Sequence, residues 1–325
     1  MPKVAPDDKA NSQRESKPQP YAPSWVDRFT AWVGRLPGPS WLYYLGLGLV
    51  LLLVQAIVLW IEGAFPIGTF LPVQGFLAGV IAFWLVLLHY LDERAGAALT
   101  TLRPALKASE EEYRRLRYQV TTLPARPTLL ASLAILISFI VIEHVIFRSL
   151  PSSFDALATS PISWALLYFI YRLLWWIFGT FIYHTIHQLR VINRIFTRHT
   201  RINLFRMKPL YAFSSVTALT AVSLTVIPYA WAAINGTLSD PIAIGMTLPF
   251  TILAFASFVW PLLGLHRLLV EEKERLLGEA SLRFEAAIAE LHQRMDSGKL
   301  EGMTDMNMAI ASLELEQNAL NRIPT

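Results

Sequence analysis

Apolar side chains run along this chain in six long stretches, at residues 41–62, 74–91, 128–148, 163–185, 210–234 and 243–264. Each stretch approaches or exceeds the roughly 20 residues that an α-helix needs to cross about 30 Å of hydrocarbon. The short connections after the first and fifth stretches are rich in Pro, Gly and Asn, which favours tight turns. The pattern predicts an all-α, polytopic membrane helical bundle with six transmembrane helices over residues 41–264.

The charged residues set the orientation of this bundle. The chain is 54% hydrophobic and only 16% charged, and 26 of its 28 Lys and Arg residues fall in 1–40, 91–127, 187–208 and 265–325. Positive charge collects on the cytoplasmic side of membrane proteins. We therefore expect a protein of the cell membrane, with both termini and the two long loops, 91–127 and 186–209, in the cytoplasm.

The N-terminal region divides into two parts. Residues 1–22 have few large apolar side chains and are expected to be disordered. Residues 23–40 have apolar side chains at helical spacing, which are Trp25, Val26, Phe29, Trp32, Val33 and Leu36. Ser24 and Asp27 are spaced as a capping box. The pattern predicts an amphipathic helix lying on the cytoplasmic leaflet, with packing on the cytoplasmic part of the protein as the alternative.

Two further helices are predicted in the long loops. Ser109, followed by three glutamates, predicts a short helix that stops before Pro124. After the fourth stretch, five basic residues fall on one helical face, namely His187, Arg190, Arg194, Arg198 and Arg201. Contact of this basic stripe with anionic lipid headgroups of the cytoplasmic leaflet is favoured, and docking on an acidic part of the same protein is the alternative. No nucleic-acid-reading motif accompanies it, so nucleic acid is not expected as a partner.

The C-terminal segment, 265–325, carries eleven acidic and seven basic residues. One apolar stripe comprises Leu265, Leu269, Leu276, Ala280, Phe284, Ala287, Leu291 and Met295. After a Gly-containing break, a second comprises Met303, Met306, Ile310, Leu313, Gln317 and Leu320. Two such stripes predict a cytoplasmic antiparallel coiled-coil hairpin. It packs on itself, on a second copy or on a protein partner through residues 265–322.

Charged residues inside the predicted spans are the candidate site. Glu143 and Arg172 lie at similar depths of adjacent antiparallel spans, so an ion pair between them is within reach, with His144 as a polar neighbour. Ionisable groups in the membrane are costly and often functional. The pair either fixes the register of two helices or belongs to a solute or proton pathway.

Common catalytic motifs are missing from the sequence. There is no Cys, no phosphate-binding glycine loop, no serine-hydrolase elbow and no His/Asp/Glu cluster at metal-ligand spacing. We therefore expect no enzyme activity, no metal and no cofactor.

Three stretches carry a resemblance to other proteins, RLPGPSW, HTRINLFRMKPLYAFS and LHRLLVEEKERLL. With them the chain resembles uncharacterised multi-pass membrane proteins of prokaryotes. The resemblance implies the same membrane fold, supplies no activity, and raises the expectation that the chain is a truncated form of a longer protein. The most favoured role is a non-enzymatic scaffold or sensor-like protein that presents the coiled coil. The alternative is an ion channel or small-solute transporter that uses Glu143 and Arg172.

Overall fold

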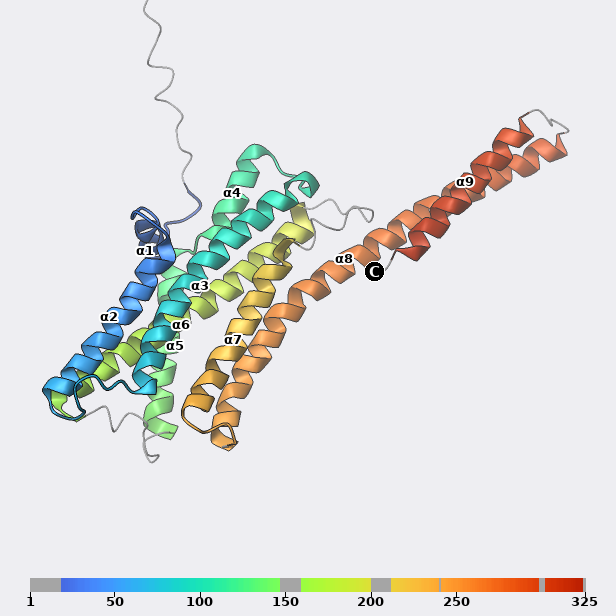
Figure 1. Ribbon diagram of the computed structural model, residues 1–325. Helices are drawn as coiled ribbons and strands as arrows, with labels where there is room; N and C mark the ends of the chain where they lie inside the picture. Colours follow the sequence, from blue (N-terminus) through green and yellow to red (C-terminus); the bar gives the residue numbers. More distant parts are fainter. Residues whose placement is uncertain (1–18, 147–158, 200–211, 240, 298–301, 324–325) are drawn as a thin grey trace, which may run out of the picture.

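The structure is a computed structural model that describes residues 19–146, 159–199, 212–239, 241–297 and 302–323. Over these ranges it is helical, without a β-strand. Its helices are α1 (Trp25–Val33), α2 (Ser40–Ile61), α3 (Pro72–Leu102), η1 (Arg103–Ala105), α4 (Glu110–Thr121), α5 (Ala125–Ile146), α6 (Pro161–Arg194), the π-helical turn η3 (Ile195–His199), α7 (Ser214–Ile234), α8 (Pro241–Asp296) and α9 (Met303–Arg322). Figure 1 shows α2, α3, α5, α6, α7 and the first part of α8 side by side as a bundle.

Six of the described helices are long and apolar enough to cross a membrane, namely α2, α3, α5, α6, α7 and α8. This confirms the all-α class and the six candidate spans. Two boundaries differ from the prediction, because α3 continues past residue 91 to Leu102 and α6 continues past residue 185 to Arg194. These extensions are covered by protein, as Leu102 and Ile192 are fully buried. Hydropathy alone detects the lipid boundary and misses a helix that continues under other helices.

Helix α3 lies at the centre of the bundle and α5 at its edge. In the most apolar stretch of 18 residues, 61% of the residues of α3 are buried, against 11% of those of α5. Helix α3 contacts α2, α4, α6 and α7, whereas α5 packs mainly on α6. The outward faces of the spans are apolar, as expected for surfaces in contact with lipid.

Small residues allow two close helix contacts. A Cβ atom added to Gly179 of α6 would lie 2.8 Å from Ser132 Cα of α5, and one added to Gly48 of α2 would lie 3.0 Å from Ala82 Cβ of α3. Ser132 Oγ and Thr180 Oγ1 are 2.8 Å apart beside the first contact, and both side chains are fully buried. Small residues and an interhelical hydroxyl pair are a common basis for helix association in membranes.

The N-terminal region is more ordered than predicted where the structure describes it. Residues 19–22 were expected to be disordered, yet Tyr118 Oη donates to the Tyr21 carbonyl at 2.7 Å and Ala125 N donates to the Ala22 carbonyl at 3.0 Å. The predicted disorder of this stretch is therefore wrong, because its backbone is tied to the start of α5. The remainder of the predicted tail, residues 1–18, lies outside the described residues.

Helix α1 packs on the bundle. Its capping box at Ser24 and Asp27 forms as predicted, but the helix ends at Val33. Val26 and Val33 are buried, and the rings of Phe29 and Tyr44 lie 6.1 Å apart. Most of its apolar face therefore covers protein, which favours the packed alternative over a helix lying free on the leaflet.

Helix α8 is one helix of 56 residues that leaves the bundle, and α9 lies beside its last part and runs in the opposite direction (Figure 1). Lys273 Nζ donates to the Ile323 carbonyl at 2.7 Å, and Gln317 Nε2 donates to Ser281 Oγ at 3.4 Å. Leu320 and Ala280 are buried between the two helices. The break predicted around Ser297 to Gly302 falls between α8 and α9, and Gly302 has a left-handed φ of 78°.

Candidate polar site at the basic end of the bundle

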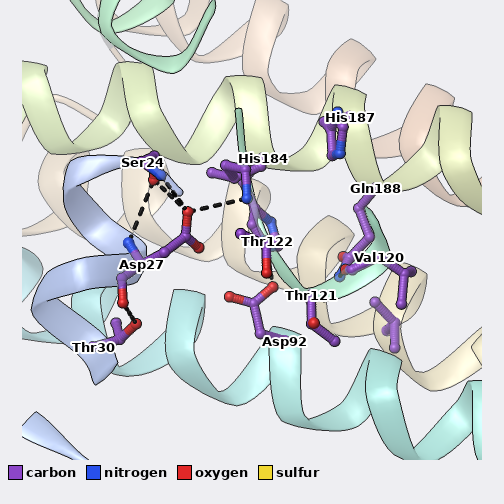
Figure 2. Close-up of polar contacts among 12 residues, drawn as sticks. Ser24, Asp27, Thr30, Asp92, Val120, Thr121, Thr122, His184, His187 and Gln188 are labelled. Atoms are coloured by element: carbon purple, nitrogen blue, oxygen red, sulfur yellow. Dashed lines mark hydrogen bonds and ion pairs between the residues drawn. The ribbon is translucent and has the colours of Figure 1, made fainter. Parts of the chain in front are cut away.

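One end of the bundle collects the Lys- and Arg-rich segments, and we call it the basic end. Helices α2 and α5 begin here, α3 and α6 end here, and α1 and α4 lie against it. Between these helices lies a group of polar side chains that come from distant parts of the sequence, with 92 residues between Asp92 and His184 and 166 between Tyr21 and His187. Figure 2 shows Asp27, Asp92 and His184 from three different helices gathered in this region.

The centre of this group is a buried pair between α3 and α6. His184 Nε2 lies 2.9 Å from Asp92 Oδ1, and the side chains are 2% and 20% exposed. The other ring nitrogen, Nδ1, is buried without a hydrogen-bond partner among the described residues. The pair therefore joins α3 to α6 through side chains that are shielded from solvent.

Asp27 connects α1 to the rest of the site through one carboxylate oxygen. Oδ2 accepts hydrogen bonds from Ser24 N at 2.9 Å and from Leu123 N at 3.0 Å. Burial raises the pKa of Asp27 to about 6, and the nearby Asp92 carboxylate raises it further while the hydrogen bonds from Ser24 and Leu123 oppose the rise. A single side chain therefore caps α1 and fastens it to the segment before α5.

A second connection runs from the N-terminal segment to α6. Tyr21 Oη donates to the Thr122 carbonyl at 2.7 Å and lies 3.4 Å from His187 Nε2, which is also 3.0 Å from the Gln119 carbonyl. Burial raises the pKa of Tyr21, so this phenol keeps its proton at neutral pH. His187 therefore faces inward. In the predicted basic stripe it differs from the exposed Arg190, Arg194 and Arg198, because its ring contacts the α4 backbone.

On the other side of Asp92, Tyr44 Oη of α2 lies 2.8 Å from His89 Nδ1 of α3. His89 Nε2 is in turn 3.2 Å from Glu93 Oε1, whose side chain is 67% exposed. Tyrosine, histidine and glutamate thus form a polar contact that reaches the surface. Together with the Asp92–His184 pair, this contact joins α2, α3 and α6, and no group of three metal-ligating side chains is found among the described residues.

The structure brings Glu143 and Arg172 together in the other half of the bundle. Arg172 Nη1 lies 2.5 Å from Glu143 Oε2, and the two side chains are 27% and 24% exposed. The two atoms make no aligned hydrogen bond, so the interaction is mainly electrostatic. Tyr168 and Tyr171 place their rings 5.4 and 5.6 Å from the guanidinium carbon. His144, predicted as a polar neighbour, is exposed.

The remaining basic stripe lies on the surface as far as it is described. Arg190, Arg194 and Arg198 are exposed, while Arg201 lies outside the described residues. In the described part of the hairpin, Arg275 and Arg294 pair locally with Glu272 and Glu290. No described ion pair joins the acidic hairpin to the stripe, which leaves the arginines open to lipid headgroups.

Three polar groups of the sequence have roles that hydropathy did not reveal. His184 and His89 lie near the ends of predicted spans, where hydropathy indicates no partner, yet each has one on another helix. Glu62 also has partners, since its carboxylate accepts hydrogen bonds from Thr159 Oγ1 at 2.8 Å and from Ser160 Oγ, and the Ser160 bond is the main cause of its lowered pKa. The sequence held one signal for these contacts, since His184, His187 and Gln188 are spaced to lie on one face of a helix.

Two hollows lie among the described helices. A narrow one of about 10 Å³, large enough for a single water molecule, is lined by Gln55, Gln74, Ser163 and four apolar residues. A groove of about 500 Å³ on the outside of α2 and α3 is lined by apolar side chains and glycines. Neither cavity is lined by Glu143 or Arg172.

Comparisons place these observations in context. No family model, curated protein or solved structure matches this chain. The fold therefore defines only a class, which is a helical membrane protein with six candidate spans and an extended C-terminal helical pair. No activity can be transferred from a relative.

Proposed function

We propose that this chain is a multi-pass protein of the cell membrane, with both termini in the cytoplasm. In this proposal it acts as a non-enzymatic scaffold or sensor-like protein. The α8–α9 pair, residues 265–323, is the presented element and forms an antiparallel coiled coil. The distribution of Lys and Arg supports the orientation, since 26 of the 28 fall in the four segments 1–40, 91–127, 187–208 and 265–325, which six spans would leave on one side of the membrane.

The observation that carries the proposal is the continuity of α8. At 1.5 Å per residue its 56 residues extend about 84 Å, whereas hydrocarbon is about 30 Å thick. No break separates the apolar part of α8 from the part that carries α9. A rigid connection of this kind holds a binding surface away from the membrane and passes a movement of the bundle to it.

The apolar stripes of α8 and α9 match in register, which supports the coiled coil. Lys273 lies beside Ile323, Ser281 beside Gln317, and Arg294 beside Gly302. The same offset places Phe284 opposite Leu313 and Leu291 opposite Met306. The two apolar stripes therefore face each other where α9 overlaps α8, from Leu276 to Leu291.

The basic end supports a role in contact with lipid. Arg190, Arg194 and Arg198 are exposed beside the end of a span. Each basic residue near an anionic leaflet gains roughly 1 kcal/mol. In the proposed orientation these arginines contact the headgroups of the cytoplasmic leaflet and fix the depth of α6.

The test places a photo-cross-linking amino acid at exposed positions of the hairpin in cells, with lipid-facing Val50 and Leu130 as matched controls. Discrete adducts from the hairpin, above those of the controls, are expected for a scaffold. The rival function is tested in parallel by solute and proton flux into vesicles that contain the purified protein. A hairpin without adducts, together with flux that Glu143→Gln removes, would replace the scaffold by a transporter.

A further inference from the structure

Helix α9 has two faces that could each support a helix contact, and only one of them is used within the chain. The inner face consists of Met306, Ile310, Leu313, Gln317 and Leu320 and packs on α8. On the opposite side, Thr304, Met308, Ala311, Leu315 and Asn318 repeat at spacings of four, three, four and three. This is the spacing of a coiled-coil seam. We call these five residues the outer seam.

The outer seam is exposed and uncharged. All five of its side chains are exposed, with Met308 at 58% and Leu315 at 70%. Ala311 at its centre is small enough for another helix to approach closely, and the flexible Met308 adapts to varied surfaces. A second seam on the far side of α9 is not required for packing on α8, because the inner face already supplies that contact.

The charges beside the outer seam define what fits it. At 100° per residue, Asp305 and Glu316 lie on one flank of the seam and Glu314 lies on the other. In the described part of the chain, neither these three carboxylates nor Arg283 of α8 form an ion pair, and three other basic groups of α8 are engaged elsewhere. Lys273 donates to the Ile323 carbonyl, and Arg275 and Arg294 pair with glutamates of α8.

A second copy of α9 does not fit this surface. Two outer seams facing each other would bring six carboxylates of the two chains together, and Arg322 is the only basic residue of α9. Like charges across a helix pair destabilise it. A helix with an apolar seam and flanking Lys or Arg would instead pair with the acids on both sides of the seam.

We propose that the outer seam of α9 binds an amphipathic helix of a protein partner whose apolar seam is flanked by Lys and Arg. This inference rests on the proposed scaffold function and specifies the chemistry of the partner. The contact extends the α8–α9 pair to a three-helix arrangement. Salt weakens it, because the flanking charges are exposed.

The experiment measures binding of two fluorescent three-heptad peptides to the full chain in nanodiscs of neutral lipid, so that the basic peptide is not drawn to the lipid. The peptides share the same Leu and Ala seam and differ only in having Lys or Glu at the flanking positions. We expect the Lys peptide to bind at least about tenfold more tightly than the Glu peptide, with affinity that falls at high salt. Nanodiscs without the protein serve as the blank.

Three variants locate the binding surface. Met308→Gln combined with Leu315→Gln should weaken binding of the Lys peptide by about tenfold or more, and Glu314→Gln combined with Glu316→Gln should weaken it without touching the seam. Leu282→Gln is the matched control, since Leu282 is a 68% exposed leucine on α8 away from the seam. It should leave binding within about twofold. All five substituted positions are exposed and lie outside the inner face, and circular dichroism checks that helix content is retained.

Several results would overturn the inference. Equal binding of the two peptides, or binding that survives the Met308 and Leu315 changes, excludes this surface. Dimers in mass photometry that dissociate in the same double variant would assign the seam to a second copy. Photo-cross-links in cells from other hairpin positions, but not from positions 308 and 315, would support the scaffold function and contradict only the binding site on the outer seam.

Discussion

At the scale of single residues, the described polar groups fall at two depths and serve different purposes. The Asp92–His184 pair and the Asp27 carboxylate lie at the basic end, where they join helices to one another. Glu143 and Arg172 lie in the opposite half and join α5 to α6. A buried ion pair contributes little net stability, since desolvation offsets attraction, but removing one partner leaves an uncompensated charge.

The first prediction concerns the Glu143–Arg172 pair. Glu143→Gln or Arg172→Met alone should destabilise the protein by about 3 kcal/mol, the lower end for broken buried pairs, because both side chains are about a quarter exposed. Replacing both with apolar residues should recover much of this loss. Thermal unfolding in detergent measures it. Additive losses in the double variant would show that the pair is not coupled.

The second prediction concerns pH and α1. The pKa of Asp27 in the folded protein, about 6, lies above its ordinary value of 3.8, so the folded state binds the proton more tightly. The stability that Asp27 contributes is therefore present below pH 4 and is lost as the pH rises through 6. After a discount for the partial exposure of Asp27, this loss of stability corresponds to a rise of about tenfold in the equilibrium constant for the opening of α1.

Hydrogen exchange of the α1 amides, corrected for intrinsic rates, measures this opening between pH 4 and 7.5. Asp27→Asn is the matched variant because its amide oxygen still accepts from Leu123 N. Its α1 protection should not depend on pH in this window. The same slope in both proteins would assign the pH dependence to other groups, such as Asp92 or His187.

At the scale of elements, the packing of the helices depends on where small residues stand. Gly179 allows α6 to touch α5, whereas Gly75 of α3 has open space where a Cβ would be. The extended parts of α3 and α6 likewise owe their length to burial against neighbouring helices. Helix length and helix contact are thus decided by partners.

The third prediction is that Gly179→Ala destabilises the protein by about 1–3 kcal/mol, as overpacking does, because the new methyl group would meet the Ser132 backbone. Gly75→Ala is the control. It should leave stability unchanged or slightly raised, since alanine favours helix over glycine. Melting temperatures in the same detergent compare the two. Equal effects would mean that α5 and α6 do not approach closely at Gly179.

At the scale of the whole molecule, the orientation in the membrane determines which surfaces meet which partners. If the basic end is cytoplasmic, the hairpin and α4 lie in the cytoplasm, and the connections after α2 and α7 lie outside. The proposed scaffold and the outer seam both depend on this orientation.

The fourth prediction tests it by cysteine labelling, for which the natural absence of Cys provides a clean background. Cysteines at Ile67 and Leu238, which are 85% and 54% exposed, should react with an impermeant external reagent. Cysteines at Lys107 and Glu290 should react only after the membrane is opened. Labelling of Glu290→Cys from outside would reverse the topology.

The sequence by itself determined the helical class, the six candidate spans, the capping box of α1 and the break before α9, because these depend on local pattern and hydrophobic length. It also indicated that Glu143 and Arg172 were at matching depth. Only the tertiary structure decided that His184 meets Asp92, that His187 faces inward, and that residues 19–22 are fixed to the start of α5. Those contacts join positions far apart in the chain, and a hydropathy pattern carries no information on which polar side chains will share one buried space.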